Sequence, residues 1–443
     1  MRTSLLLLAM LLCPVLAFSQ NDEWDSARFP RRWLYDFVVP DNGSFVDAVH
    51  AANNRHDKKR RYRIFVKSSY YTVKGDEDTI KTVEKGAEVR FPSPMTVLTA
   101  PNTSIIGEGW KDTKIINVPL HEGISITSTL YLKGADSTYI QDIELWCNFR
   151  NDVRAFANRA VALNEKRCKG NIFKNVSLLS TQDTYYTNDG GTTYLENCRI
   201  SGTVDFICGG GTIFFNECDL LLRARGKNGS RDVICAPATK ENLRYGYVFS
   251  NCRISGTDEQ QDRYRLGRPW KNAPRAVFLN TKMNLRPSPD GWTEMHGTVP
   301  ALFAEYKSVD AEGNALDLSQ RKSTFKNRKG RTVAVNYPCS LTDDMVERYT
   351  LDDIFPKWKP REACRQVAPP TLKMNGRNVI VWEEIPDAAC YAICIDGDVV
   401  TFTRQAKYVV PEDTKEGACF SVRCANWHGG LGAASNEVVY PNR

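Results

Sequence analysis

The sequence predicts an all-β protein, a parallel β-helix followed by a small β-sandwich, and three observations support this. A short apolar segment containing an Asn recurs between residues 139 and 285. Short alternating strands separated by Gly and Asp turns fill residues 378–439. Helical periodicity is confined mainly to a short stretch near the start, so strands must build most of the core.

The chain opens with the pattern of a signal peptide. Arg2 supplies a positive start, residues 5–12 an apolar stretch, and Ala17 and Ser19 a cleavage zone. We therefore expect residues 1–19 to be removed and the protein to be secreted or periplasmic. Because no later segment offers the roughly 18 apolar residues of a membrane helix, we expect no membrane insertion.

Length and charge bound the organisation of the mature chain. The roughly 420 residues left favour two or more domains, which we place at 20–360 for the β-helix, 361–368 for a linker and 369–443 for the sandwich. The formal net charge of +7 serves solubility or suits an acidic polymer. The basic run at residues 58–61 is short and lies just before a strand, so we expect no nucleic-acid partner.

An amphipathic helix is predicted after Ser44, which is a candidate N-cap. Apolar residues follow at Phe45, Val46, Val49 and Ala52. Such a helix would cover the open end of a β-helix, where strand edges are otherwise unpaired.

The repeated segment defines the coils. Taking Val176, Cys198, Cys218, Cys252 and Thr281 as equivalent positions gives spacings of 22, 20, 34 and 29 residues. Short, irregular repeats without helical periodicity indicate a parallel β-helix, and the longer spacings hold loops. A β-sandwich could use such strands, but it would not repeat the same Asn-containing segment. In the β-helix the three cysteines point inward and stack as small buried hydrophobes.

The composition shifts near residues 356–370, where Pro, Lys and Arg cluster, and a second strand pattern follows. A buried Trp382 and the turn at residues 425–430 resemble a fibronectin type III module. If the strands at 390 and 419 are antiparallel neighbours, the pairs Cys394–Cys419 and Cys390–Cys424 have sums of 813 and 814. The two sums differ in parity, so we expect at most one cross-strand disulfide.

The role of this second part is open. We expect a spacer or a protein-contact domain, with Trp427 and His428 at a loop tip as a further option for glycan binding. Thirteen cysteines remain after cleavage and none forms a C-x-x-C pair, so we expect no zinc site.

Two aspartates carry the strongest chemical signal. Asp183 and Asp205 lie 22 residues apart, close to the period of the repeat, so they fall on neighbouring coils at roughly 4.8 Å strand spacing. Two charges held so close are unfavourable, so one carboxyl stays protonated as a general acid and the other acts ionised as nucleophile or base. Gln182 could donate to a developing oxyanion, Arg268 could fork onto a carboxylate, and Trp270 could stack on a sugar ring.

Three motifs resemble the signature motifs of pectin methylesterases. They are Gln-Asp-Thr at 182–184, Gly-Thr-Val-Asp-Phe-Ile at 202–207 and Leu-Gly-Arg-Pro-Trp at 266–270. Further similar segments lie at 160–163, 291–292 and 41–45, so the resemblance covers roughly residues 35–360. It implies a right-handed parallel β-helix without metal or other cofactor, acting on methyl-esterified pectin (homogalacturonan), and we expect the chain to be a monomer.

The resemblance also assigns roles. Asp205 would attack the ester carbonyl, and Asp183 would protonate the departing methanol and then activate water. Gln182 would bind the oxyanion and Arg268 would orient Asp205. The substrate groove would be lined by Tyr186, Trp270 and Trp292.

Two departures from the family pattern lie at the site. Arg159 stands where the family usually has Gln, before the Ala-Val-Ala-Leu segment, and we expect it to contact substrate. Cys208 stands where the family usually has Phe, which makes one wall of the groove smaller.

Other function classes remain open from the residues alone. Two acidic residues could serve an inverting glycosidase, whose carboxyls stand about 6.5–9.5 Å apart to admit water. A lyase would need clustered carboxylates for calcium, and no such cluster surrounds Asp183 and Asp205. A binding module that lost catalysis is the third possibility. Methanol release, new reducing ends, or binding without turnover would distinguish the three.

Overall fold

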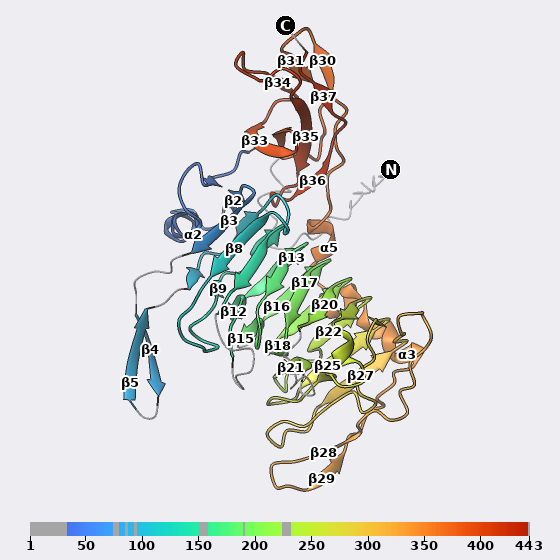
Figure 1. Cartoon of the computed structure of the whole chain (residues 1–443). Helices are drawn as coiled ribbons and strands as arrows, with labels where there is room; N and C mark the ends of the chain where they lie inside the picture. Colours follow the sequence, from blue (N-terminus) through green and yellow to red (C-terminus); the bar gives the residue numbers. More distant parts are fainter. Residues whose placement is uncertain are drawn as a thin grey trace, which may run out of the picture.

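The computed structural model describes residues 33–73, 79–84, 87–92, 95–149, 158–188, 191–223 and 232–441. The signal peptide expected at residues 1–19 lies outside this part of the chain. Figure 1 shows coils of short parallel strands stacked from the N-terminal end to a helical segment, with a separate group of antiparallel strands beside the first coils.

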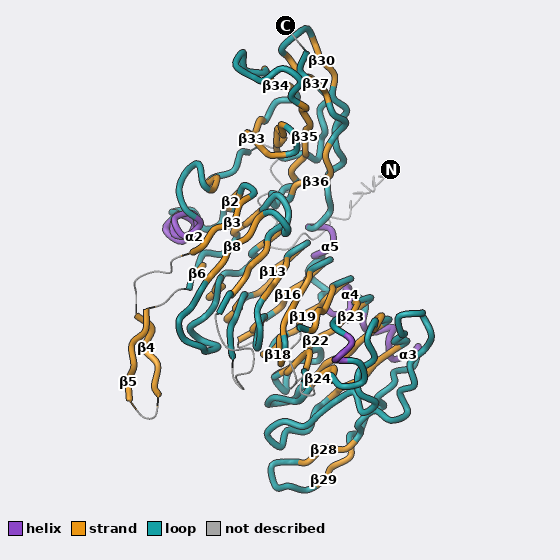
Figure 2. The backbone as a smooth tube through the Cα atoms, viewed as in Figure 1, coloured by secondary structure: helices purple, strands orange, loops and turns teal. Residues whose placement is uncertain are grey.

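Three parallel sheets run along the described coils and confirm the predicted β-helix (Figure 2). The first has the order β1 (Phe37–Val39), β2 (Tyr62–Val66), β7 (Thr103–Ile106), β10 (Tyr139–Gln141), β13 (Lys169–Lys174), β16 (Thr192–Glu196), β19 (Thr212–Asn216), β22 (Tyr247–Ser250), β25 (Arg275–Leu279) and β27 (Leu302–Tyr306). The second has the order β3 (Ser69–Val73), β8 (Thr113–Asn117), β11 (Glu144–Cys147), β14 (Ser177–Leu179), β17 (Arg199–Gly202), β20 (Asp219–Leu222), β23 (Arg253–Ser255) and β26 (Lys282–Met283). The third has the order β6 (Thr96–Leu98), β9 (Leu130–Lys133), β12 (Leu163–Lys166), β15 (Tyr185–Asn188), β18 (Val204–Gly209), β21 (Val233–Pro237) and β24 (Arg265–Gly267).

The strand register reproduces the predicted spacing. Ile172 pairs with Tyr194, Tyr194 with Phe214, Phe214 with Val248 and Val248 with Val277, which gives steps of 22, 20, 34 and 29 residues. The residue three positions after each of these adopts a left-handed conformation that turns the chain into the second sheet. It is Asn175, Asn197, Asn251 or Asn280 in four coils and Glu217 in the remaining one.

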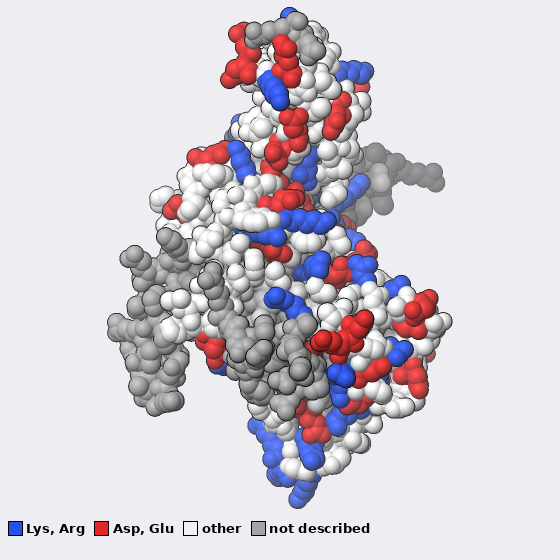
Figure 3. Space-filling view, viewed as in Figure 1, with Lys and Arg blue, Asp and Glu red and all other residues white. Residues whose placement is uncertain are grey.

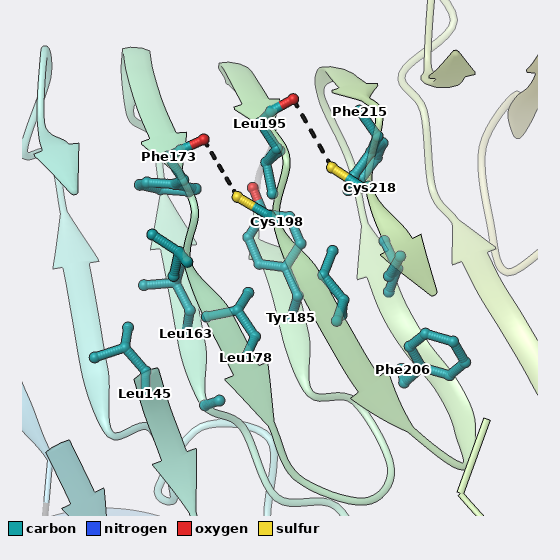
Figure 4. Close-up of a cluster of buried hydrophobic side chains, with 14 of the residues drawn as sticks. Leu145, Leu163, Phe173, Leu178, Tyr185, Leu195, Cys198, Phe206, Phe215 and Cys218 are labelled. Atoms are coloured by element: carbon teal, nitrogen blue, oxygen red, sulfur yellow. Dashed lines mark hydrogen bonds between the residues drawn. The ribbon is translucent and has the colours of Figure 1, made fainter. Parts of the chain in front are cut away.

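The interior confirms the inward-facing cysteines (Figure 4). The thiol of Cys198 donates to the carbonyl oxygen of Phe173 at 3.3 Å, and that of Cys252 donates to Phe215 at 3.5 Å. Each contact joins one coil to the preceding one, so the thiols add weak polar links to a core that is otherwise apolar. No disulfide joins any of the thirteen cysteines that the structure describes.

The predicted helix is α2 (Phe45–Asn54), which closes the N-terminal end of the core. The Ser44 side chain accepts from the Asp47 amide and the Asp47 carboxylate accepts from the Ser44 amide, a capping box. Phe45 and Val49 are buried against the first coils, while Val46 is only partly buried.

The remaining described elements follow or interrupt the coils. They are the hairpin β4 (Thr79–Glu84) and β5 (Ala87–Pro92), the 3-10 helix η2 (Asp258–Gln260), the hairpin β28 (Thr324–Lys326) and β29 (Thr332–Ala334), α3 (Asp343–Val346), η3 (Glu347–Tyr349), α4 (Leu351–Ile354) and α5 (Pro360–Ala363). No described helix is long and apolar enough to cross a membrane.

The C-terminal part contains two antiparallel sheets with an apolar core between them. One has the order β30 (Lys373–Asn375), β31 (Val379–Val381), β34 (Lys407–Val409); the other has the order β33 (Asp398–Thr403), β32 (Cys390–Ile395), β35 (Cys419–Ala425), β36 (Leu431–Ala434), with β37 (Val438–Val439) paired to β35. Trp382 is buried in this core, as predicted. The layered strands therefore agree with a small sandwich.

Neither of the two cysteine pairs considered across β32 and β35 lies in register. Cys390 faces Ala425 and Cys394 faces Ser421, so paired residues sum to 815 and neither cysteine pair lies directly opposite. The parity argument itself holds, because Cys390 and Cys394 pack in one apolar cluster and Cys424 in another.

The loop after β35 docks onto the first coils instead of standing free. The carbonyl oxygen of Trp427 accepts two bonds from Arg63, at 3.2 and 2.8 Å, and His428 packs on Tyr139 with ring centroids 5.3 Å apart. Arg63 is fully buried and its guanidinium also lies over the Trp33 ring. Trp427 and His428 therefore hold the two parts together, and the option of a free glycan-binding tip is not supported.

Candidate active site

The site lies on the third sheet, where neighbouring coils bring Asp183 and Asp205 together. Tyr185 pairs with Ile207, so the two aspartates stand at equivalent positions one coil apart, as their spacing predicted. The amide of Asp183 donates to the carbonyl of Val204 at 3.2 Å, which ties the two segments directly beside both carboxyls.

Local backbone geometry turns both aspartates out of the regular strands. Their φ angles are +63° for Asp183 and +49° for Asp205, in the left-handed region that Gly, Asn and Asp adopt more readily than other residues. The register between β18 and β21 shifts between Val204 and Ile207, so Asp205 lies in a β-bulge. Bulges re-aim a side chain next to a functional site, and here the bulge carries the carboxylate.

Arg268 holds the carboxylate of Asp205 from two strands away. It follows β24, and its guanidinium reaches past β21. The Nε donates to Oδ1 of Asp205 at 2.8 Å, and Nη2 donates to Oδ2. Asp205 is only 3% exposed, so this fork satisfies a charge that would otherwise be costly to bury. The arrangement stabilises Asp205 in its ionised form.

Asp183 is set up in the opposite protonation state. Its side chain is 5% exposed, and burial followed by the nearby charge of Asp205 raises its pKa to about 8. The thiol of Cys208, 3.6 Å from Oδ1, and the guanidinium groups of Arg159 and Arg268 lower the pKa but do not reverse the shift. At neutral pH the pair therefore holds one proton, on Asp183, and one negative charge, on Asp205.

Arg159 and Gln182 lie side by side at the edge of the site. They are partners in a parallel β-bridge, and residues paired in this way project to the same face. The Gln182 side chain is half-buried and makes no hydrogen bond to any residue the structure describes. Its amide is thus positioned to donate to a bound group.

Arg159 is fixed by Glu122, a residue that sequence reasoning did not find. Its Nε and Nη2 donate to the two carboxylate oxygens of Glu122 at 2.7 and 2.5 Å. The hydrogen bond to Glu122 is the main cause of the raised pKa of Arg159. Glu122 belongs to the preceding coil, 37 residues earlier, and no local pattern marks it.

An apolar wall adjoins the two aspartates. Tyr186, Cys208, Val161 and Ala236 form a small cluster, and Trp270 packs against it with its ring 6.2 Å from that of Tyr186. Trp270 remains partly exposed, so its ring can stack on a ligand. Tyr186 is almost fully buried and supports Trp270 from below.

The prediction that Trp292 lines the groove is wrong. Its side chain is 0% exposed and stacks on Phe303 inside the β-helix, with ring centroids 4.7 Å apart. Its backbone bridges Gly267, which anchors the strand that delivers Arg268. The nearby motif made Trp292 appear functional, but its contribution is to the core.

A separate cavity of about 1120 Å³ lies between the coils and the C-terminal helical segment. Four of its charged residues form ion pairs, Lys174 with Glu196 at 2.9 Å and Lys359 with Asp352 at 2.6 Å. It shares no residue with the aspartate site. Among the described residues, no group of three or more His, Cys, Asp or Glu side chains could hold a metal ion.

Known proteins resemble this chain over the same region. The family model described as Pectinesterase matches residues 41–340. Pectinesterase A of Dickeya dadantii is 36% identical over 211 residues, which are 42% of this chain and 54% of that protein. Pectinesterase/pectinesterase inhibitor U1 of Solanum lycopersicum is 27% identical over 310 residues, 65% of this chain and 48% of that protein. The chain thus spans about half the length of these curated relatives.

Solved structures agree with the fold. A mutant pectin methylesterase in complex with a hexasaccharide is 25% identical and superposes with a TM-score of 0.57, over 74% of this chain and 99% of that one. The carrot pectin methylesterase is 22% identical, with a TM-score of 0.56 over 73% of this chain and 94% of that one, and supports the fold alone.

Proposed function

The chain belongs to the pectinesterase family, and we propose that it hydrolyses the methyl esters of galacturonate in pectin. The observation that carries this proposal is the aspartate pair with one proton. Asp205 is held ionised by the Arg268 fork, and Asp183 is kept protonated by burial and by the charge beside it. Ester hydrolysis through an acyl-enzyme needs both states at once.

In the first half-reaction Asp205 attacks the ester carbonyl. Its carboxylate oxygen forms a bond to the carbonyl carbon, and the carbonyl electrons move to oxygen. Collapse of this intermediate breaks the bond to methoxide, which takes the proton of Asp183 and leaves as methanol. The product is an anhydride between Asp205 and the galacturonate, with Asp183 now ionised.

In the second half-reaction Asp183 takes a proton from water. The hydroxide formed attacks the acyl carbon and releases galacturonate and the Asp205 carboxylate, so both groups return to their starting states. Gln182, with its unengaged amide, donates to the oxyanion in both steps. The Arg159 guanidinium beside it carries a positive charge toward the same position.

The wall beside the aspartates gives the substrate class. Trp270 presents a flat, partly exposed ring supported by Tyr186, which suits the apolar face of a sugar ring. One hexasaccharide complex of a structural relative supports an oligosaccharide as the ligand. We therefore propose methyl-esterified homogalacturonan as the substrate.

We also propose the remaining features of the chain. The N-terminal pattern supports cleavage after residue 19 and export, the domain limits are those predicted from composition, and the chain acts as a monomer. The two antiparallel sheets around Trp382 support a fibronectin type III-like module. Its docking through Trp427 makes it a rigid support for the first coils.

The test measures methanol released from highly methylated pectin, with EDTA present and new reducing ends counted in parallel. Methanol without reducing ends is the expected result and identifies a metal-independent esterase. New reducing ends would identify a glycosidase or lyase instead. Binding of pectin with neither product would indicate a binding protein whose catalysis is lost.

A further inference from the structure

Basic residues gather at the C-terminal end of the β-helix. Residues 318–342 contain six Lys or Arg and no Asp or Glu, in a chain whose net charge is +7. The hairpin of β28 and β29 lies in this segment. In Figure 3, Lys and Arg cluster at the end of the molecule where Figure 1 places these two strands.

The hairpin is well anchored. Phe325 is fully buried and its ring contacts that of Phe303, the strand residue that also stacks on Trp292. At the tip, the Asn327 carboxamide oxygen accepts from the amides of Lys329 and Arg331 at 3.0 and 3.1 Å. The backbone of the tip therefore has a fixed shape.

Two of the six cations are already neutralised. Arg321 pairs with Glu305 at 2.6 Å in the core, and Lys322 pairs with Glu294 at 3.1 Å. The other four are exposed and form no ion pair with any described residue: Lys326, Arg328, Lys329 and Arg331. Four like charges on one hairpin repel each other, and an anionic partner would relieve that repulsion.

A single segment connects this hairpin to the active-site wall. The hydroxyl of Thr298 donates to the carbonyl oxygen of Trp270 at 3.1 Å. The adjacent Gly297 packs so closely on the hairpin that a Cβ there would lie 2.8 Å from the Cα of Arg328. Residues 297–298 thus lie between the hairpin and the Trp270 wall of the active site.

We propose that the β28–β29 hairpin is an anion-binding extension of the active-site groove that holds the carboxylates of unesterified galacturonate. The proposal rests on the proposed esterase function. A polymer stretch that has already lost its methyl groups is a polyanion, and it binds the four cations while a neighbouring methyl ester lies at Asp205. The attraction is between exposed charges, so it weakens as salt rises above about 0.1 M.

The test is a variant in which Lys326, Arg328, Lys329 and Arg331 are all changed to Gln. Its matched control changes four exposed lysines of the C-terminal sheets and the segment before them to Gln: Lys357, Lys373, Lys407 and Lys415. Both variants lose the same charge, and neither changes a residue of the aspartate site. Binding of unesterified polygalacturonate and the KM for low-ester and high-ester pectin are measured at low and at high salt.

At low salt the hairpin variant is expected to bind polygalacturonate about tenfold more weakly than wild type, since each exposed charge pair contributes modestly. Its KM rises by a similar factor on low-ester pectin and stays unchanged on high-ester pectin, with kcat unaltered. Equal losses in the two variants, or an equal rise in KM on both pectins, would overturn the proposal. A wild-type protein that binds polygalacturonate through the hairpin without releasing methanol would contradict the esterase function and leave the anion site standing.

Discussion

Changing Glu122 to Gln tests how the Glu122–Arg159 pair controls Asp183, the proposed catalytic acid. Glu122 holds the Arg159 guanidinium in a fork, and Arg159 acts on Asp183 by lowering its pKa. Without the carboxylate, the charge of Arg159 is uncompensated and its side chain can approach Asp183. The pKa of Asp183 should then fall from about 8, and the alkaline limb of kcat/KM should move to lower pH.

The expected shift follows from Coulomb's law. A unit charge about 6 Å away contributes about 2.8 kcal/mol at an effective dielectric constant of 20, and about 0.7 kcal/mol in water. Arg159 is 44% exposed, so solvent screening places the effect near the lower value. We expect a shift of about half a pKa unit to one unit, which slows the reaction at pH 9 roughly threefold to tenfold.

Arg159→Gln is the matched variant and should move the limb the other way. It removes a charge that lowers the pKa of Asp183, and it introduces the residue that the family usually carries there. The double variant should behave as Arg159→Gln alone, because Glu122 acts through Arg159. Methanol release between pH 5 and 10, corrected for chemical hydrolysis with the Asp205→Asn protein, gives the profiles. If the alkaline limbs of the kcat/KM profiles coincide in wild type and in all variants, the reasoning is refuted.

Three further outcomes follow from the contacts of the site and of the docked C-terminal part. The Asp183→Asn variant should be more stable than wild type at pH 9. Because the pKa of Asp183 is raised in the folded protein, wild-type stability falls as the pH rises from about 4 to about 8. The uncharged Asn side chain removes up to about 5 kcal/mol of that loss, which thermal unfolding at pH 5 and pH 9 measures. The Arg268→Gln variant leaves the buried Asp205 without its charged partner. The free energy of unfolding in urea should fall by about 3 kcal/mol, and kcat should fall at least a hundredfold. Near-wild-type values of both would contradict the hydrogen-bonded pairing of Arg268 with Asp205. Arg63→Gln removes two bonds to the Trp427 carbonyl and should cost about 2 kcal/mol in the same urea assay, whereas an unchanged midpoint would mean that the docked loop does not stabilise the first coils.

Repetition made the coils predictable from sequence. Each coil must place an apolar residue inward and turn at the same point, so the spacing between Val176, Cys198 and Cys252 in the sequence equals the spacing of paired strands. The same rule brought Asp183 and Asp205 together, because in-register parallel strands stack equivalent positions.

Features set by tertiary contacts were not accessible in this way. The bulge that re-aims Asp205 leaves no mark in the hydrophobic pattern, because it depends on which residue of β21 each residue of β18 meets. Glu122 reaches Arg159 from another coil, and either residue alone is an ordinary surface charge. Trp292 follows a Gly in a family-like segment, and only the closed core around Phe303 shows that it is buried.

In the C-terminal sheets, the strand register could not be predicted from the sequence positions of the cysteines. The assumed register placed Cys390 opposite Cys424, whereas the true register is shifted by one residue and places Ala425 there. A one-residue shift exchanges the two faces of a strand, so turn length and packing decide the outcome.

The most direct test of the aspartate mechanism compares wild type with Asp205→Asn in methanol release and in binding of highly methylated pectin. The account predicts that the variant folds with an unchanged circular dichroism spectrum, binds pectin within about threefold of wild type, and loses at least a thousandfold in turnover. Substantial methanol release from the Asp205→Asn protein would contradict the assignment of Asp205 as the nucleophile.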